Sequence, residues 1–276
     1  MRTPLAYYGG KQRLAARIVS LMPPHSVYCE PFAGGCAVMF AKPKAAREII
    51  NDLDDSIAGF WKAVRDHGER LAAMVAATPY SRAEWNASRR PTDDPVEAAR
   101  RLLVNVDQSY SRSRRGWSPP SISSDHRARW QPSTWGGLPA RIQEACERLR
   151  GVCIERTDGV ELIARCDVPG AVIYLDPPYP HSARRVPYGY DVESEPDLWG
   201  RIADALTRVR HASVIVSGFP CPEMEALGWD SIRVPVRMTA GAKGITVLGF
   251  SPETLWVSPH GIRGHQLTLA TSEATP

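Results

Sequence analysis

The 276-residue chain lacks the features that mark membrane proteins, secreted proteins and classical dinucleotide enzymes. No apolar run approaches the roughly 20 residues of a membrane-spanning helix, and the opening residues lack the apolar core of a signal peptide. The glycine fingerprint Gly-x-Gly-x-x-Gly is also absent, which argues against an NAD enzyme. These absences predict a cytoplasmic protein with no membrane partner.

Cysteine is present, but not in the patterns that bind metals. No Cys-x-x-Cys pair occurs, and no histidine stands near a cysteine at ligand spacing. We therefore expect reduced, mostly buried thiols and no bound metal. The six cysteines are Cys29, Cys36, Cys146, Cys153, Cys166 and Cys221.

Charge is balanced everywhere except in one window. The net charge is +4, and residues 108–130 hold five of the 34 basic residues and one of the 30 acidic residues, which leaves 29 of each elsewhere. Aromatic residues alternate with the arginines in and just after this window. Arginines can contact phosphates, and aromatic rings can stack on bases. A solvated polar surface is the other interpretation.

Residues 171–175 read Ala-Val-Ile-Tyr-Leu, which predicts a strand buried on both faces of a sheet. The chain is 43% hydrophobic, which is enough to build the core around such a sheet. The following proline pair ends the strand. Asp176, the Pro177 carbonyl and the Tyr179 ring would then meet at the carboxyl edge of the sheet, where open α/β folds bind ligands. The two acceptors suit an amino group on a flat heterocycle, and the ring can stack on it. A plain strand-ending turn is the alternative.

Two turns that contain glycine precede helical stretches in the first 40 residues. The glycines before Lys11 let the backbone approach a ligand, and a helix start assisted by Lys11 favours a carboxylate. An ordinary capping turn is the alternative. The second turn has the strand, turn and helix context that a nucleotide-like ligand requires. Its sequence is Glu30-Pro31-Phe32-Ala33-Gly34-Gly35.

Acidic residues follow two further predicted strands. Asp52 stands two residues after an apolar pair and about 20 residues after the glycine turn, where a doubly wound fold places its ribose ligand. Asp54 or Asp55 is expected to cap the next helix, and Asp158 ends a predicted strand that begins at Val152 and can cap a helix at 159–164. Further strands are predicted at 213–218, 232–238 and 254–258, the last two as the antiparallel edge of the sheet.

Residues 76–150 interrupt the α/β pattern and are too many for an ordinary loop. They contain prolines, a helical stretch at 96–106 and the arginine-rich window, and they predict an inserted, mainly helical module. A second basic and aromatic loop follows Tyr179 and could close over a base or phosphate. The candidate nucleic-acid contacts of the two segments are Arg112, Arg114, Arg115, Arg127, Arg129, Arg184, Arg185 and Tyr188.

The motifs Glu-Pro-Phe-x-Gly at 30–34 and Asp-Pro-Pro-Tyr at 176–179 resemble those of the Dam-type DNA adenine-N6 methyltransferases, the alpha group of the D12 class. The resemblance implies a doubly wound, mostly parallel sheet of the Rossmann-like methyltransferase type, with S-adenosylmethionine lying across the strand ends. The chain departs from the family at Cys36 and Ala37, where serine is common.

The resemblance also implies roles for single residues. Lys11 would lie in the cofactor pocket, and Asp158 near the adenine of the cofactor. Asp176 and the Pro177 carbonyl would accept the amino hydrogens of a flipped-out adenine, and Tyr179 would stack on its ring. The insert would recognise duplex DNA. The cofactor contacts that we predict are Tyr7, Lys11, Glu30, Pro31, Phe32, Gly34, Asp52, Asp158 and Asp176.

The predicted division places the catalytic domain at 1–75 and 151–260, the target-recognition insert at 76–150 and a tail at 261–276. We expect a monomer or weak dimer, with a cognate restriction endonuclease as an open partner. Rival functions are an RNA adenine or DNA cytosine-N4 methyltransferase on the same scaffold and a catalytically silent DNA-binding protein. Aspartate rather than serine before the proline pair argues against cytosine N4.

Overall fold

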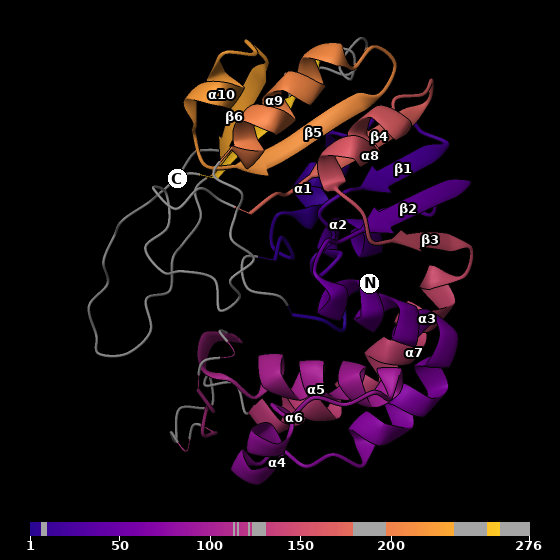
Figure 1. Cartoon of the computed structure of the whole chain (residues 1–276), viewed down its shortest axis with the longest axis vertical. Helices are drawn as coiled ribbons and strands as arrows, with labels where there is room; N and C mark the ends of the chain where they lie inside the picture. Colours follow the sequence, from indigo (N-terminus) through magenta and orange to yellow (C-terminus); the bar gives the residue numbers. More distant parts are fainter. Residues whose placement is uncertain are drawn as a thin grey trace, which may run out of the picture.

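A seven-stranded sheet forms the centre of the computed structural model, which describes residues 1–6, 10–112, 114, 116–120, 122, 131–178, 197–234 and 253–259. The strands are β1 (Val27–Glu30), β2 (Arg47–Asn51), β3 (Val152–Glu155), β4 (Ala171–Leu175), β5 (Ser213–Gly218), β6 (Asp230–Val234) and β7 (Glu253–Val257). Their order across the sheet is β3-β2-β1-β4-β5-β7-β6 (Figure 1). The pairs that contain β7 are antiparallel and the others parallel, which confirms the predicted mostly parallel α/β sheet.

Helices cover both faces of this sheet. Successive residues of a strand point to opposite faces, so Tyr28, Ile50 and Tyr174 pack with α1, α2 and α3 on one side, while Cys29 and Ile173 pack with α8, α9 and α10 on the other. The helices are α1 (Ala15–Ser20), α2 (Ala37–Ala41), α3 (Asp55–Ala76), α4 (Arg82–Ala87), α5 (Pro95–Asp107), α6 (Gln131–Gly136), α7 (Leu138–Leu149), α8 (Gly159–Arg165), α9 (Leu198–Arg208) and α10 (Pro222–Glu225), with a 3-10 turn, η1 (Tyr110–Arg112).

The helices α4 to α7, here called the helical region, lie beside the sheet and are joined to it by α3 (Figure 1). Asp54 caps α3 by accepting from the Ser56 amide at 2.8 Å, and the helix packs against both α5 and α7. One hydrophobic cluster runs from Tyr28 in the sheet to Leu103 in α5 and Ile142 in α7. The segment 76–150 therefore shares a core with the sheet, and its status as a separate recognition module stays a prediction.

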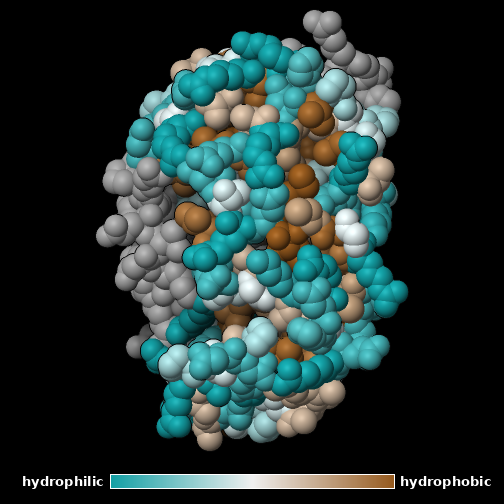
Figure 2. Space-filling model, turned by 45° about the vertical axis from the view of Figure 1, so that its right-hand side comes forward, coloured by the Kyte–Doolittle hydropathy of each residue, from teal (hydrophilic) through white to brown (hydrophobic). Residues whose placement is uncertain are grey.

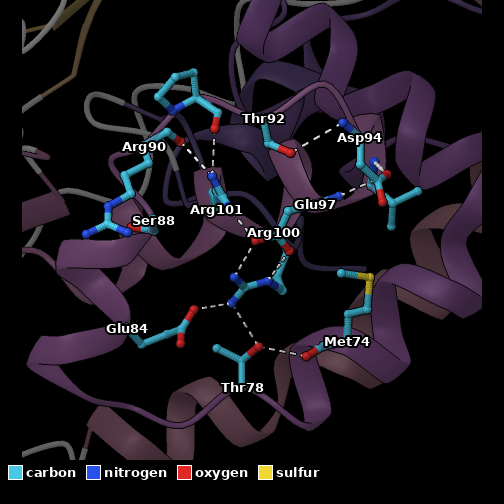
Figure 3. A network of polar contacts seen from close by, with 12 residues as sticks. Met74, Thr78, Glu84, Ser88, Arg90, Thr92, Asp94, Glu97, Arg100 and Arg101 are labelled. Carbon is cyan, nitrogen blue, oxygen red and sulfur yellow. Dashed lines mark hydrogen bonds and ion pairs between the residues drawn. The ribbon is translucent and has the colours of Figure 1, made fainter.

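Two neighbouring arginines hold α4, α5 and the turn between them together (Figure 3). Arg100 lies between Glu84 of α4, at 2.5 Å, and Glu97 of its own helix, at 2.6 Å. Arg101 also pairs with Glu97, at 2.6 Å, and donates to backbone carbonyls at 90–91. Both guanidinium groups are thus committed to contacts within the helical region.

The surface is mainly polar on the face seen in Figure 2, where apolar side chains appear as small patches between hydrophilic ones. Among the residues that the structure describes, no helix is long and apolar enough to cross a membrane. All six thiols are free; Cys146 is half-buried, Cys153 is exposed and the other four are buried.

A charge cluster fixes α7 to the sheet. The buried Glu48 of β2 accepts from Lys42 at 2.6 Å and from two guanidinium nitrogens of Arg148 in α7. Burial raises the pKa of Glu48, but the donors from Arg148, the Ala45 amide and Lys42 outweigh it and bring the pKa to about 2. The carboxylate therefore stays ionised in the folded protein and balances two cations.

Glu48→Gln should lower the free energy of unfolding by about 3–5 kcal/mol at pH 7, because it leaves Lys42 and Arg148 without their counter-charge. The folded-state pKa lies below the ordinary value of 4.5, so the advantage of the wild type should shrink as the pH falls from 4.5 towards 2. Urea unfolding at several pH values measures both effects. Glu155→Gln, which affects the more exposed pair with Arg165, is the control and should cost at most about 1 kcal/mol. Equal losses in both variants would contradict the argument.

Candidate active site at the carboxyl edge of the sheet

Four acidic residues lie where parallel strands end. Glu30 is the last residue of β1, Asp52 follows β2, Asp158 comes shortly after β3, and Asp176 follows β4. β1 and β4 are neighbours, but α2, which follows β1, and α9, which follows β4, pack on opposite faces of the sheet. Open α/β sheets bind their ligands at such a switch point. The fold therefore gathers these acids along the edge where ligands bind in such sheets.

Asp176 is paired with a buried cation. Lys11 Nζ lies 2.7 Å from Asp176 Oδ1 and 3.0 Å from Glu253 Oε1, and Lys11 is 5% exposed. Burial lowers the pKa of Lys11, but attraction to the two carboxylates outweighs it, so the pKa is raised and the ammonium stays charged. Lys11 thus pairs with two protein carboxylates, and its predicted contact with a cofactor stays a prediction.

The two proline carbonyls after Asp176 differ in their partners. Trp199 of α9 donates its indole N–H to the Pro178 carbonyl at 3.0 Å. Among the described residues, none donates to the Pro177 carbonyl. The carbonyl predicted to accept from a substrate is therefore the one that accepts no hydrogen bond from the described residues. Tyr179 lies outside the described residues, and its stacking role stays a prediction.

The turn after β1 is joined to the acid after β2. Gly34, at φ 44°, donates its amide to Asp52 Oδ2 at 2.8 Å, and its carbonyl accepts from the Trp61 indole at 2.9 Å. Burial raises the pKa of Asp52 to about 6, against the amide donors of Gly34 and Asp54. Asp52 is partly accessible and ionised at neutral pH, so it can accept hydrogen bonds from a ligand.

A buried asparagine links the turns after β1 and β3. Asn51 Nδ2 donates to the Pro31 carbonyl at 2.9 Å and to the Thr157 carbonyl at 3.0 Å, and its Oδ1 accepts from the Thr157 amide at 2.8 Å. The turns also touch directly, since a Cβ on Gly159 would lie 2.9 Å from both the Phe32 ring and the Pro31 carbonyl oxygen. Glycine at 159 is therefore required for this close approach.

The other two acids have partners of their own. Tyr28 donates to Glu30 Oε2 at 2.9 Å, and burial, aided by the charge of Asp176, raises the pKa of Glu30 to about 8. Glu30 is thus mostly protonated at neutral pH. Asp158 caps α8 by accepting from the Val160 amide at 2.8 Å and pairs with Arg201 of α9. Its capping role is therefore present, and its predicted contact with adenine stays a prediction.

The predicted DNA contacts are only partly described. Arg112 and Arg114 lie in a tight loop after α5, closed by a hydrogen bond of 2.8 Å from the Tyr110 amide to the Gly116 carbonyl. Both arginines adopt φ 58°, a conformation that is uncommon for residues other than glycine. The predicted site residues that fall outside the described part of the chain are Tyr7, Tyr179, Arg115, Arg127, Arg129, Arg184, Arg185 and Tyr188.

The amino-terminal third of the chain contains Lys11, the glycine turn and Asp52. A family model matches this region. Residues 7–100 match the D12 class N6 adenine-specific DNA methyltransferases. The resemblance drawn from the motifs is confirmed for this stretch, and the D12 class supports adenine methylation of DNA as the activity. No curated protein matches the chain. The D12 match ends before Asp176, so the catalytic role of the Asp-Pro-Pro-Tyr motif stays a prediction.

Three residues of the candidate site escaped the sequence analysis. Asn51 and Ser217 lie on strands that were predicted. Their partners are distant in the sequence, so the residues next to them along the chain do not indicate these contacts. Glu253 is 7% exposed and begins β7. A lone acid at the start of an otherwise apolar strand is the one signal that could have drawn attention to it.

Asn51→Ala should lower the free energy of unfolding by about 2–3 kcal/mol, because it removes three hydrogen bonds and leaves buried backbone groups unpaired. It should also speed hydrogen exchange at the Thr157 amide, which NMR or mass spectrometry can follow. Asn105→Ala is the control, because Asn105 makes a single hydrogen bond of 3.0 Å to the Ser88 carbonyl, far from this edge. Unchanged exchange at Thr157 would show that Asn51 does not hold the two turns.

Proposed function

We propose that the chain transfers a methyl group from S-adenosylmethionine to N6 of an adenine flipped out of duplex DNA. The observation that carries the proposal is the Asp176 carboxylate, held by Lys11 at 2.7 Å at the end of β4 and followed by the Pro177 carbonyl, which accepts no hydrogen bond from the described residues. An ionised acceptor and a carbonyl on consecutive residues match the two hydrogens of an exocyclic amino group. The D12 match over residues 7–100 supports adenine in DNA as the target.

The residues at the strand ends fit the proposed cofactor. Asp52, ionised above a pKa of about 6 and partly accessible, can accept from the two ribose hydroxyls. Glu30, Pro31, Phe32 and Gly34 would form the wall of the pocket that the Asn51 amide holds in place. When bound, the cofactor would supply an electrophilic methyl group on a sulfonium centre.

The side chains would act by orientation and electrostatics. Asp176 and the Pro177 carbonyl accept the amino hydrogens, which holds the lone pair of N6 in line for attack. As the N–C bond forms, the bond from the methyl group to sulfur would break and a neutral thioether would leave with the electron pair. The nitrogen gains positive charge in this step, and the nearby carboxylate would stabilise that charge and is in reach of the proton that N6 must lose. No nucleophilic side chain is required. Flipping costs about a few kcal/mol, which stacking on Tyr179 would partly offset.

Asp176→Ala should abolish transfer of labelled methyl groups from S-adenosylmethionine to unmethylated DNA, with a loss of at least about 100-fold. Nucleoside analysis of the wild-type product should give N6-methyladenine. Asp204→Ala is the control, because Asp204 is exposed and pairs with Arg208 in α9. Normal turnover by Asp176→Ala would refute the mechanism, and label found in RNA or in N4-methylcytosine would favour the rival methyltransferases. No transfer by the wild type would favour the silent binder.

Arg112→Gly should weaken DNA binding without destabilising the protein. Glycine adopts positive φ freely, so the free energy of unfolding should stay the same or rise by about 1 kcal/mol. Loss of one phosphate contact should reduce the slope of log affinity against log salt concentration by about 0.9. Arg208→Ala, at the end of α9 and hence at the opposite edge of the sheet, should leave the slope unchanged. An unaltered slope in Arg112→Gly would mean that this loop is merely solvated.

A further inference from the structure

Both side chains that donate to Asp176 use the same carboxylate oxygen. Lys11 Nζ lies 2.7 Å from Oδ1, and Ser217 Oγ lies 3.1 Å from it. Within the described part of the chain, no hydrogen bond or ion pair reaches Oδ2. A carboxylate has two acceptor oxygens, so the described residues leave one oxygen of Asp176 available as an acceptor.

Ser217 takes its own orientation from Tyr174. Its Oγ lies 2.9 Å from Tyr174 Oη, 3.1 Å from Asp176 Oδ1 and 3.4 Å from the Leu175 carbonyl. A serine hydroxyl has one hydrogen to donate, and the ionised oxygen of Asp176 is its strongest acceptor. Tyr174 must then donate to Ser217, so the two buried hydroxyls form a directed relay from β4 through β5 to Asp176.

The relay needs a phenol that keeps its hydrogen. Burial and then the charge of Asp176 raise the pKa of Tyr174 well above its ordinary value. Tyr174 is 1% exposed and Ser217 is fully buried, so water does not compete for either hydroxyl. The direction of the relay is therefore set by the protein.

Glu253 performs the corresponding task for Lys11. An ammonium on a flexible stem can swing about a single partner, but a second carboxylate 3.0 Å from Nζ fixes its direction.

We infer that Ser217, oriented by Tyr174, and Glu253, acting through Lys11, are positioning residues that fix the rotation of Asp176 and leave Oδ2 as the oxygen that receives the amino group. This inference rests on the proposed methyl transfer. Without these contacts the carboxylate could rotate about its last bond, and misplacement of a reacting group by about 1 Å costs about 100-fold in rate.

Single-turnover and steady-state methyl transfer to DNA test the inference on the full chain. Ser217→Ala and Tyr174→Phe should each lower kcat by about 10- to 100-fold, while the KM for S-adenosylmethionine changes little, because the contacts orient the acceptor and do not bind the cofactor. Glu253→Gln should lower kcat in the same way. Ser217→Thr, which keeps the hydroxyl, should recover most of the loss. Ser213→Ala, at the other end of β5, is the matched control and should keep the wild-type kcat.

A double-mutant cycle separates the relay from a merely structural role. Tyr174 acts on Asp176 only through Ser217, so Tyr174→Phe should change kcat by less than about 2-fold once Ser217→Ala is present. Independent losses in kcat, or wild-type kcat in both single variants, would overturn the inference while leaving the proposed function intact. Melting temperatures confirm that each variant is folded, and Tyr174→Phe keeps the ring in the core if Ser217→Ala unfolds. A wild-type chain that methylates no adenine would refute the proposed function itself.

Discussion

The ion pair between Lys11 and Asp176 is the contact on which the arrangement of the site depends. A buried ammonium is stable only if its charge is balanced and its hydrogens have acceptors, because its transfer from water costs several kcal/mol. The balance comes from the residue after β4 and the first residue of β7, while the lysine comes from the segment before α1. Three distant parts of the chain therefore meet at one point, and the same pairing holds the carboxylate that would perform the chemistry.

The strand that carries Asp176 could be predicted because its physical requirements are local. A strand buried on both faces must be apolar throughout, and proline cannot continue it. The apolar run at 171–175 and the proline pair at 177–178 therefore predict both the strand and its end. The strand at 213–218 was also predicted with its observed bounds. In contrast, the partners of Ser217 and Glu253 depend on strand order. No local pattern says that β7 enters between β5 and β6, or that its first residue reaches Lys11.

The arginines of the helical region show the same division between local and distant information. The sequence shows that positive charge gathers near residues 108–130, but it does not show which guanidinium groups are occupied. Arg100 and Arg101 are bound to Glu97 within their own helix and to groups of neighbouring segments (Figure 3), whereas Arg112 is 43% exposed and lies 3.8 Å from Asp107. Only the folded structure separates arginines that hold the protein together from those that can meet a phosphate.

The hydrogen bonds of Asn51 and Asp52 have a consequence for the energetics of ligand binding. Asn51 connects the turns after β1 and β3, and Asp52 connects the turn after β1 to the end of β2. Hydrogen bonds therefore link the carboxyl ends of three strands to one another. Loops that must become ordered around a ligand subtract that ordering entropy from the affinity. Here folding has already ordered these turns through hydrogen-bonded side chains of the protein itself, so a ligand that binds to them would lose little affinity to the ordering of loops.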